Sequence, residues 1–161
     1  MPPPPENMVV EGSVAQLLPD GSAAAPADAP EPVKQAIWAA NKLQDKPYKY
    51  GGGHAKIEDT GYDCSGTVSY ALIAAGLLTS PLPSGPFTRW GEKGKGAWIT
   101  VYAHGGHAYA VIAGLRLDTS SYASRTARKR KVIASTLERG PRWRSTMRPS
   151  RGFRARHPLG L

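Results

Sequence analysis

The sequence predicts an α+β fold, in which N-terminal helices pack on a central antiparallel β-sheet. Apolar residues recur at helical spacing in 31–44 and again in 64–75. Strand-like segments rich in β-branched and aromatic residues follow at 98–102, 107–112 and 115–119. The pair Ala113-Gly114 separates the last two segments as a two-residue hairpin turn, which makes these strands antiparallel. A chain of 161 residues is long enough to bury one core.

Residues 1–30 are rich in Pro, Ala, Gly and Asp. Such a segment buries too little apolar surface to offset the entropy of ordering it. We therefore expect a linker or extended arm at 1–30 and one folded domain at 31–161. The N-terminus shows neither a basic region nor an apolar stretch of the signal-peptide kind, so the chain is either cytoplasmic or a trimmed piece of a longer protein.

The first expected helix, 31–44, begins with Glu31 and Pro32, which suit a first helical turn. Its apolar face, formed by Val33, Ile37, Ala40 and Leu43, is expected to pack in the core. A loop at 46–54 follows, in which three consecutive glycines allow a close backbone approach. It lacks the Gly-Lys-Ser/Thr ending of a phosphate loop, and its His54 is expected to be an ordinary loop histidine.

The second expected helix begins at the only cysteine of the chain, Cys64, with Asp63 as N-cap and Gly76 just past its end. Two interpretations of Cys64 are open. It continues an apolar stripe and is then a small core residue. Alternatively, the unpaired N–H groups and dipole of the helix N-terminus lower its pKa, which makes the thiolate a nucleophile.

A long loop rich in Pro and Gly is expected at 79–97. Loops of this length inside a compact domain are usually functional or mobile. Its aromatic residues Phe87 and Trp90 either contact substrate at the wall of a groove or only cover the sheet.

The expected hairpin places a histidine beside a carboxylate. With a turn at 113–114, Tyr109 pairs with Asp118 and His107 pairs with Ser120, so His107 and Asp118 are diagonal neighbours on one face. A slip by one residue would separate them onto opposite faces. In the expected register, His107 is a base for the thiol and Asp118 is the acceptor that holds the imidazole in one tautomer.

The charge of the chain is uneven. The net charge is +9, but residues 125–161 carry twelve Arg and Lys and a single acidic residue, whereas residues 1–124 are slightly acidic. A basic segment at about 121–151 favours a polyanionic neighbour, such as a cell-wall polymer, a membrane surface or nucleic acid, or is a solvated tail. Within it, 132–137 is either a strand or a short helix. After it, 152–157 is expected to be a late edge strand.

Three motifs resemble those of the NlpC/P60 family of papain-like cysteine peptidases. The stretch 47–52, Pro-Tyr-Lys-Tyr-Gly-Gly, is similar to the family's Pro-Tyr-x-aromatic-Gly-Gly. The stretch 63–66, Asp-Cys-Ser-Gly, matches its nucleophile motif, and Gly-His-Ala-Tyr-Ala-Val at 106–111 resembles its histidine strand. The resemblance spans about 47–119.

The resemblance implies a papain-like core and hydrolysis of peptidoglycan stem peptides, usually at the bond from D-γ-glutamate to a diamino acid. By motif position, Cys64 is the nucleophile, His107 the base and Asp118 the third member. Residues facing the amine-bearing end of the substrate are then Tyr48, Asp63 and Ser65. A secreted or cell-wall-associated location follows, with anionic wall polymers as partners of the basic segment, no specific nucleic acid, no cofactor and no metal.

Several points depart from the family or stay open. The family's third position is commonly His, sometimes Asn or Gln, and here it is Asp118. His104 is a weaker candidate for the base because only His107 begins the apolar strand. Asp63 should raise the pKa of the adjacent thiol unless it caps the helix or pairs with a substrate amine. A papain-like amidase or acyltransferase, and a polyanion-binding module with an inert cysteine, are the alternative functions.

Overall fold

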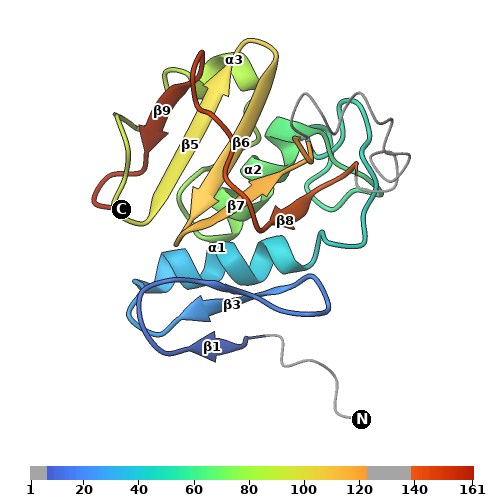
Figure 1. Cartoon of the computed structure of the whole chain (residues 1–161). Coiled ribbons are helices and arrows are strands. Elements are labelled where there is room, and N and C mark those ends of the chain that lie inside the picture. The colour runs from blue at the N-terminus through green and yellow to red at the C-terminus, as the bar shows by residue number, and fades with distance from the viewer. Residues whose placement is uncertain (1–6, 123–138) are drawn as a thin grey trace.

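The structure, a computed structural model, describes residues 7–122 and 139–161. Its centre is a six-stranded sheet with the strand order β4-β9-β5-β6-β7-β8 (Figure 1). The strands are β4 (Glu92–Lys93), β5 (Ile99–His104), β6 (His107–Ile112), β7 (Leu115–Asp118), β8 (Arg142–Arg144) and β9 (Arg154–His157). All neighbouring pairs are antiparallel. The predicted α+β class with a central antiparallel sheet is therefore confirmed.

Helix α2 (Cys64–Ala74) packs directly on β6 and β7, and helix α1 (Glu31–Asn41) packs on α2. Residues 65–72 of α2 are all buried, as expected for a helix that is apolar or small on every side. The Asp63 carboxylate caps the helix by accepting a hydrogen bond from the Gly66 N–H at 2.7 Å. Gly76 lies just past the end of α2 with φ of +75°, a conformation that glycine adopts without strain.

The hairpin of β6 and β7 has the predicted register. Ile112 pairs with Leu115 and Ala110 pairs with Leu117, which continues to Tyr109 opposite Asp118. The turn residue Ala113 has φ of +49° and Gly114 has φ of +90°, as a tight two-residue hairpin turn requires. His107 and Asp118 are therefore diagonal neighbours on one face of the sheet.

The expectation of a linker or extended arm at 1–30 is wrong for the described residues 7–30. They form a second sheet, ordered β1-β3-β2, from β1 (Val9–Val10), β2 (Gln16–Leu17) and β3 (Ala23–Pro26). This sheet packs on α1 through β3, whose residues are all buried (Figure 1). The small alanine side chains of β3 let its backbone pack close to the helix. Its backbone polar groups are paired with β1 and β2. Amino-acid composition reveals neither of these features.

The expected long loop 79–97 contains two short elements, α3 (Ser84–Phe87) and β4. Phe87 is fully buried and lies edge-to-face with the half-buried Trp90, with ring centroids 5.8 Å apart. Both rings belong to the main core cluster or pack against it. Of the two interpretations of these aromatics, the structure therefore supports the one in which they cover the sheet.

The C-terminal segment joins the sheet at two places. Strand β8 pairs with β7, and β9 lies between β4 and β5, so the expected late strand is not at the edge. The undecided stretch 132–137 lies outside the described residues. Among the residues that are described, no helix has the length and apolar character needed to cross a membrane.

Asn41, at the end of α1, joins three parts of the fold. Its Oδ1 accepts hydrogen bonds from the Ala23 N–H of β3 and from Nε1 of the buried Trp143 in β8, both at 2.8 Å. Its Nδ2 donates to the Ala23 carbonyl at 2.9 Å. One side chain thus connects the N-terminal sheet, α1 and the last part of the large sheet.

We expect Asn41→Leu to lower the free energy of unfolding by about 2–4 kcal/mol, because it removes three hydrogen bonds and leaves the Trp143 N–H buried without an acceptor. Urea denaturation measures the change. The matched control is Gln35→Ala on the same helix, whose side chain donates a hydrogen bond to the exposed Glu31 and whose loss should cost within about 0.5 kcal/mol. Equal, small losses in both variants would contradict this role of Asn41.

Candidate active site

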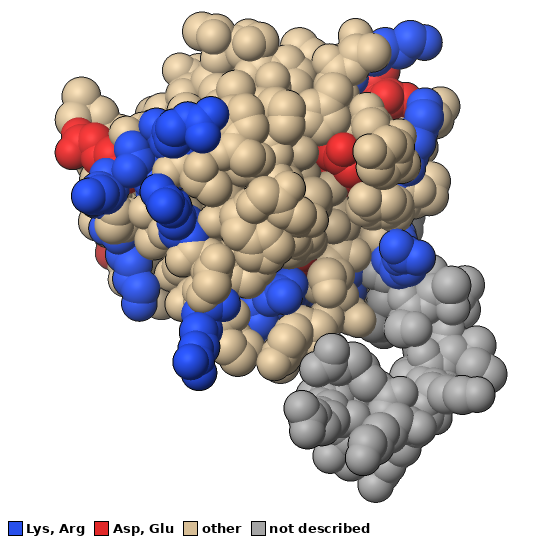
Figure 2. Space-filling model, turned by 90° about the horizontal axis from the view of Figure 1, so that it is seen from above, with Lys and Arg blue, Asp and Glu red and all other residues tan. Residues whose placement is uncertain are grey.

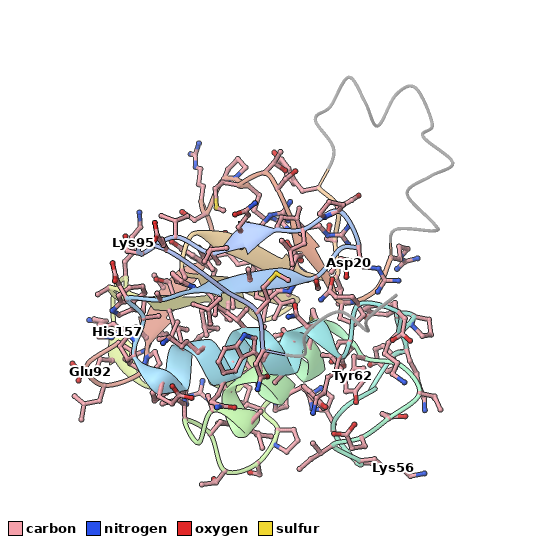
Figure 3. The ribbon with its side chains drawn as sticks, turned by 90° about the horizontal axis from the view of Figure 1, so that it is seen from below. Asp20, Lys56, Tyr62, Glu92, Lys95 and His157 are labelled. Atoms are coloured by element: carbon pink, nitrogen blue, oxygen red, sulfur yellow. The ribbon has the colours of Figure 1, made fainter. Side chains whose placement is uncertain are left out.

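The site forms where a glycine loop lies against the start of α2. A Cβ atom at Gly66 would lie 2.1 Å from the Gly52 carbonyl oxygen, so residue 66 has to be glycine for the loop to approach this closely. The same carbonyl accepts a hydrogen bond from the Asp63 N–H at 3.2 Å. Tyr62 anchors the rest of the loop by donating its hydroxyl to the Ile57 carbonyl at 2.7 Å. In Figure 3, Tyr62 and Lys56 lie at the opposite end of the molecule from Glu92, Lys95 and His157.

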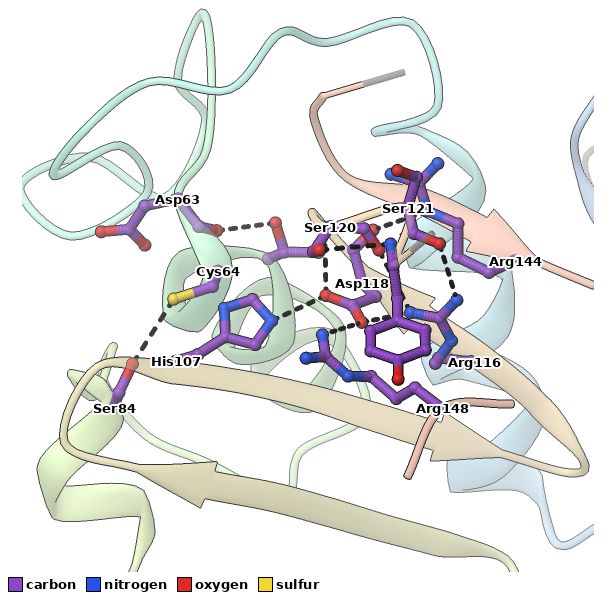
Figure 4. A network of polar contacts seen from close by, with 12 residues as sticks. Asp63, Cys64, Ser84, His107, Arg116, Asp118, Ser120, Ser121, Arg144 and Arg148 are labelled. Atoms are coloured by element: carbon purple, nitrogen blue, oxygen red, sulfur yellow. Dashed lines mark hydrogen bonds and ion pairs between the residues drawn. The ribbon is translucent and has the colours of Figure 1, made fainter. Parts of the chain in front are cut away.

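Cys64 lies at the first turn of α2, partly exposed, with its sulfur beside the imidazole of His107 (Figure 4). The Ser84 hydroxyl, at the start of α3, lies 3.4 Å from the sulfur. Burial raises the pKa of the Cys64 thiol, but hydrogen bonds from His107 and Ser84 and the charge of His107 outweigh it, so the pKa lies below its ordinary value. Cys64 is thus a partly exposed thiol whose surroundings favour its ionisation.

His107, the first residue of β6, connects the thiol to Asp118. Its Nε2 lies 2.8 Å from Asp118 Oδ1, which leaves Nδ1 as the ring nitrogen that faces Cys64 (Figure 4). Burial lowers the pKa of His107, but the hydrogen bonds to Asp118 and Cys64 raise it by more. The net effect is a pKa of about 9. The pKa of the thiol is thus lowered while that of the imidazole is raised, and both shifts favour a thiolate–imidazolium pair.

Asp118 is 1% exposed and sits among four donors. Its Oδ1 accepts from His107 and, at 3.0 Å, from the Ser120 N–H. Its Oδ2 accepts from Arg116 and, at 3.1 Å, from Arg148. Burial raises the pKa of this carboxyl, but the His107 hydrogen bond and charge, the Ser120 N–H and the Arg116 guanidinium outweigh it, so Asp118 is ionised.

The two arginines on Asp118 were not anticipated as site residues. Arg116 is fully buried, and it also donates to the carbonyls of Thr146, Ser120 and Ser121. Strand periodicity places Arg116 on the same face as Asp118, so the sequence spacing could have indicated that the two side chains are neighbours. Arg148 follows β8, thirty residues from Asp118, and no sequence pattern connects the two.

Asp63, Ser65 and His54 form a second polar group beside the thiol. Asp63 Oδ1 lies 2.8 Å from His54 Nε2 and 3.3 Å from the Ser65 hydroxyl, in addition to its cap on α2. The Ser65 hydroxyl also lies 3.1 Å from His54 Nε2. His54 was expected to be an ordinary loop histidine, and the structure instead places it on Asp63. Asp63 Oδ2 has no hydrogen-bond partner within the described part of the chain.

Tyr48 lies near the same carboxylate and thiol. Burial raises the pKa of its phenol, and the nearby charges of Cys64 and Asp63 raise it further. The Arg139 guanidinium lies 5.3 Å from the centre of the Tyr48 ring, a cation–π distance. All six residues named from the sequence are thus gathered at one place: the triad Cys64, His107 and Asp118, and the group Tyr48, Asp63 and Ser65.

His104 lies opposite His107 in the sheet, at the last position of β5. Its Nδ1 accepts a hydrogen bond from the Gly106 N–H at 2.9 Å, and its ring lies 4.4 Å from that of Phe153, centre to centre. The His104 imidazole thus contacts Gly106 and Phe153. His107 rather than His104 therefore faces Cys64, as the strand pattern indicated.

Much of the basic charge is used inside the fold. Arg142 donates to the Lys46 carbonyl, Arg144 to the Asp118 carbonyl, and Arg156 to the carbonyls of Trp90 and Gly91. On the face shown in Figure 2, Lys and Arg side chains lie mainly toward the left. The basic segment is thus partly structural, and residues 123–138 within it lie outside the described chain.

The chain matches no protein-family model, and neither the curated proteins nor the solved structures include a significant match. Within the described residues, no group of three or more His, Cys, Asp or Glu side chains is arranged to hold a metal ion.

We expect iodoacetamide to alkylate Cys64 at neutral pH faster than a free thiol. The pH at which the rate increases should lie below the ordinary thiol pKa of 9.0. In His107→Gln this pH should be higher by about one unit or more, because the stabilising cation is lost while burial remains. Mass spectrometry at several pH values measures the rate. If the rise is at the same pH in both proteins, the thiolate–imidazolium pair is absent.

Proposed function

We propose that the protein is a cysteine endopeptidase of the papain-like NlpC/P60 type, which hydrolyses peptidoglycan stem peptides. The single observation that carries the proposal is the position of His107, whose two ring nitrogens face a thiol at a helix N-terminus and a buried carboxylate. A nucleophile, a base and an orienting acid in contact are the minimum set for acyl transfer by a thiol. The motifs at 47–52, 63–66 and 106–111 direct this chemistry toward cell-wall peptides.

The proposed reaction begins with attack of the Cys64 thiolate on the amide carbonyl. The charge that develops on the carbonyl oxygen is stabilised by the Cys64 backbone N–H, which lies in the first turn of α2 where N–H groups have no intrahelical acceptor. The His107 imidazolium then donates its proton to the leaving amine, and a thioester remains on Cys64.

Hydrolysis of this thioester regenerates the enzyme. The now neutral His107 takes a proton from water, the hydroxide attacks the thioester carbonyl, and the Cys64 thiolate leaves. Asp118 holds the imidazole in the same orientation through both steps. The imidazolium form is needed for the first step, so acylation should weaken as pH rises through about 9.

The group of Tyr48, Asp63 and Ser65 is proposed to bind the amine-bearing end of the stem peptide. Asp63 supports this role because Oδ1 is held by the helix cap and by His54, whereas Oδ2 is left for a ligand. A cationic amine on Oδ2 would form a charge-assisted hydrogen bond. The bond cut would be that from D-γ-glutamate to the diamino acid.

The location proposed for such an enzyme is outside the cell or on the wall. Basic side chains not used inside the fold would hold it on anionic wall polymers by charge. No specific nucleic acid is proposed as a partner, and neither a cofactor nor a metal has a step in this mechanism.

We expect digestion of purified peptidoglycan to release fragments with a new amine on the diamino acid, and Cys64→Ala to release none. Mass analysis of the fragments identifies the bond. Both proteins should give the same circular dichroism spectrum, since Cys64 is partly exposed. Cleavage by Cys64→Ala would refute the mechanism, and no cleavage by the wild type together with a reactive thiol would favour an amidase or acyltransferase on another acyl group.

A second prediction concerns the amine end. Asp63→Asn keeps the helix cap, because Asn is as good an N-cap as Asp, but it removes the negative charge. We expect KM for a stem tripeptide with a free N-terminal amine to rise about tenfold, as for loss of a charge-assisted contact. The same peptide acetylated at the amine should be cleaved equally by both proteins. An equal rise in KM for both peptides would show that Asp63 does not read the amine.

A further inference from the structure

Arg148 lies between the Asp118 carboxylate and three aromatic rings. Its Nη1 donates to Asp118 Oδ2 at 3.1 Å. Its guanidinium carbon lies 5.2 Å from the ring centre of Tyr109, 5.0 Å from that of Tyr122 and 5.3 Å from that of Phe153. These are cation–π distances, so the rings fix the guanidinium in place while one edge of it faces the carboxylate.

Packing alone does not account for an arginine at this position. The side chain is 14% exposed, and its Nε is buried with no hydrogen-bond partner in the described residues. A buried donor without an acceptor lowers stability, and an apolar side chain of similar size would fill the space between the rings without that penalty. Asp118 is the one acidic group with which Arg148 forms an ion pair in the described chain.

Asp118 also has a counter-ion without Arg148. Arg116 is fully buried on the same oxygen, Oδ2, and the other oxygen faces His107. Within the described residues, the other charged and titratable groups around this carboxylate are Tyr109 from β6, Arg144 from β8 on the Asp118 carbonyl, and Cys64 beyond His107. Arg148 therefore adds a second positive charge to a carboxylate that one guanidinium already neutralises.

A second guanidinium has two effects on the triad. It completes the set of donors on Oδ2, which keeps Oδ1 directed at His107. It also reduces the negative potential that Asp118 exerts at the imidazole, so that the imidazolium gives up its proton more readily. Both effects serve the step in which His107 protonates the leaving amine.

We propose that Arg148 is a positioning residue for the Cys64–His107–Asp118 triad, which fixes the Asp118 carboxylate and limits the basicity of His107. The catalytic consequence rests on the proposed peptidase function, whereas the effect on His107 does not. The segment after β8 is thereby part of the active-site machinery, because the residue that faces the triad acid comes from it.

The test follows the titration of His107 by NMR of ¹³C- or ¹⁵N-labelled imidazoles, with the signal assigned through His107→Gln. In the wild type this titration should lie near 9. We expect Arg148→Met to raise it by about half a unit to one unit, since a positive charge near the carboxylate is lost. Arg148→Lys, which keeps the charge, should remain closer to the wild type.

The matched control is Arg151→Met, which removes an exposed arginine three positions along the chain and should leave the titration unchanged. On a wall-peptide substrate, we expect kcat of Arg148→Met to fall about tenfold with little change in KM, because proton donation to the leaving group is impaired. The alkaline limb of its pH profile should move upward with the NMR titration.

A purely structural role predicts a different result, in which Arg148→Met lowers the thermal midpoint but His107 titrates as in the wild type. That result overturns the proposal. If Arg148→Met does not fold, Arg148→Gln, which keeps a donor and loses the charge, is titrated with the same expectation. A wild type that cleaves no wall peptide refutes the peptidase, while the titration, which needs no substrate, still decides the role of Arg148.

Discussion

The buried carboxylate of Asp118 is the constraint on which the rest of the site depends. An ion removed from water is tolerated only when other charges and donors replace its hydration, and here two guanidinium groups, one imidazole and one backbone N–H do so. Each donor comes from a different part of the chain: β6, β7, the turn after β7 and the segment after β8. Satisfying one charge thus ties the histidine strand and the C-terminal segment together, and it sets the orientation of the imidazole that faces Cys64.

At the start of α2, the Asp63 carboxylate lies next to the Cys64 thiol in sequence. A carboxylate in this position should oppose ionisation of that thiol, but Asp63 directs Oδ1 to the Gly66 N–H and to His54 rather than to the sulfur. Ser84 and His107 instead contact the sulfur, and both favour the thiolate. Asp63 therefore caps the helix through Oδ1, while its Oδ2 has no hydrogen-bond partner in the described part of the chain. The close approach of Gly52 and Gly66 makes this arrangement possible, because any side chain at position 66 would hold the loop away.

Arginines in this protein have a more varied role than net charge suggests. A chain with twelve basic residues in its last 37 positions invites an interpretation as a polyanion-binding tail. In the described part of that segment, however, several guanidinium groups are hydrogen-bonded to backbone carbonyls or to Asp118. Arginine suits this use, since its planar fork donates in several directions and stays charged when buried. Charge counts alone do not separate such structural cations from those free to bind a partner.

Local patterns in the sequence determined the helix that begins at Cys64, its cap at Asp63, the β6–β7 hairpin and hence the pairing of His107 with Asp118. Helix caps, hairpin turns and strand alternation act over a few residues, so their outcome is readable from adjacent positions. Tertiary structure alone decided that residues 9–26 pack on α1, that His54 and Ser84 join the site, and that Arg148 reaches a carboxylate thirty positions away. These contacts join segments distant in the chain, where burial and charge neutralisation depend on the whole fold and leave no periodic trace in the sequence.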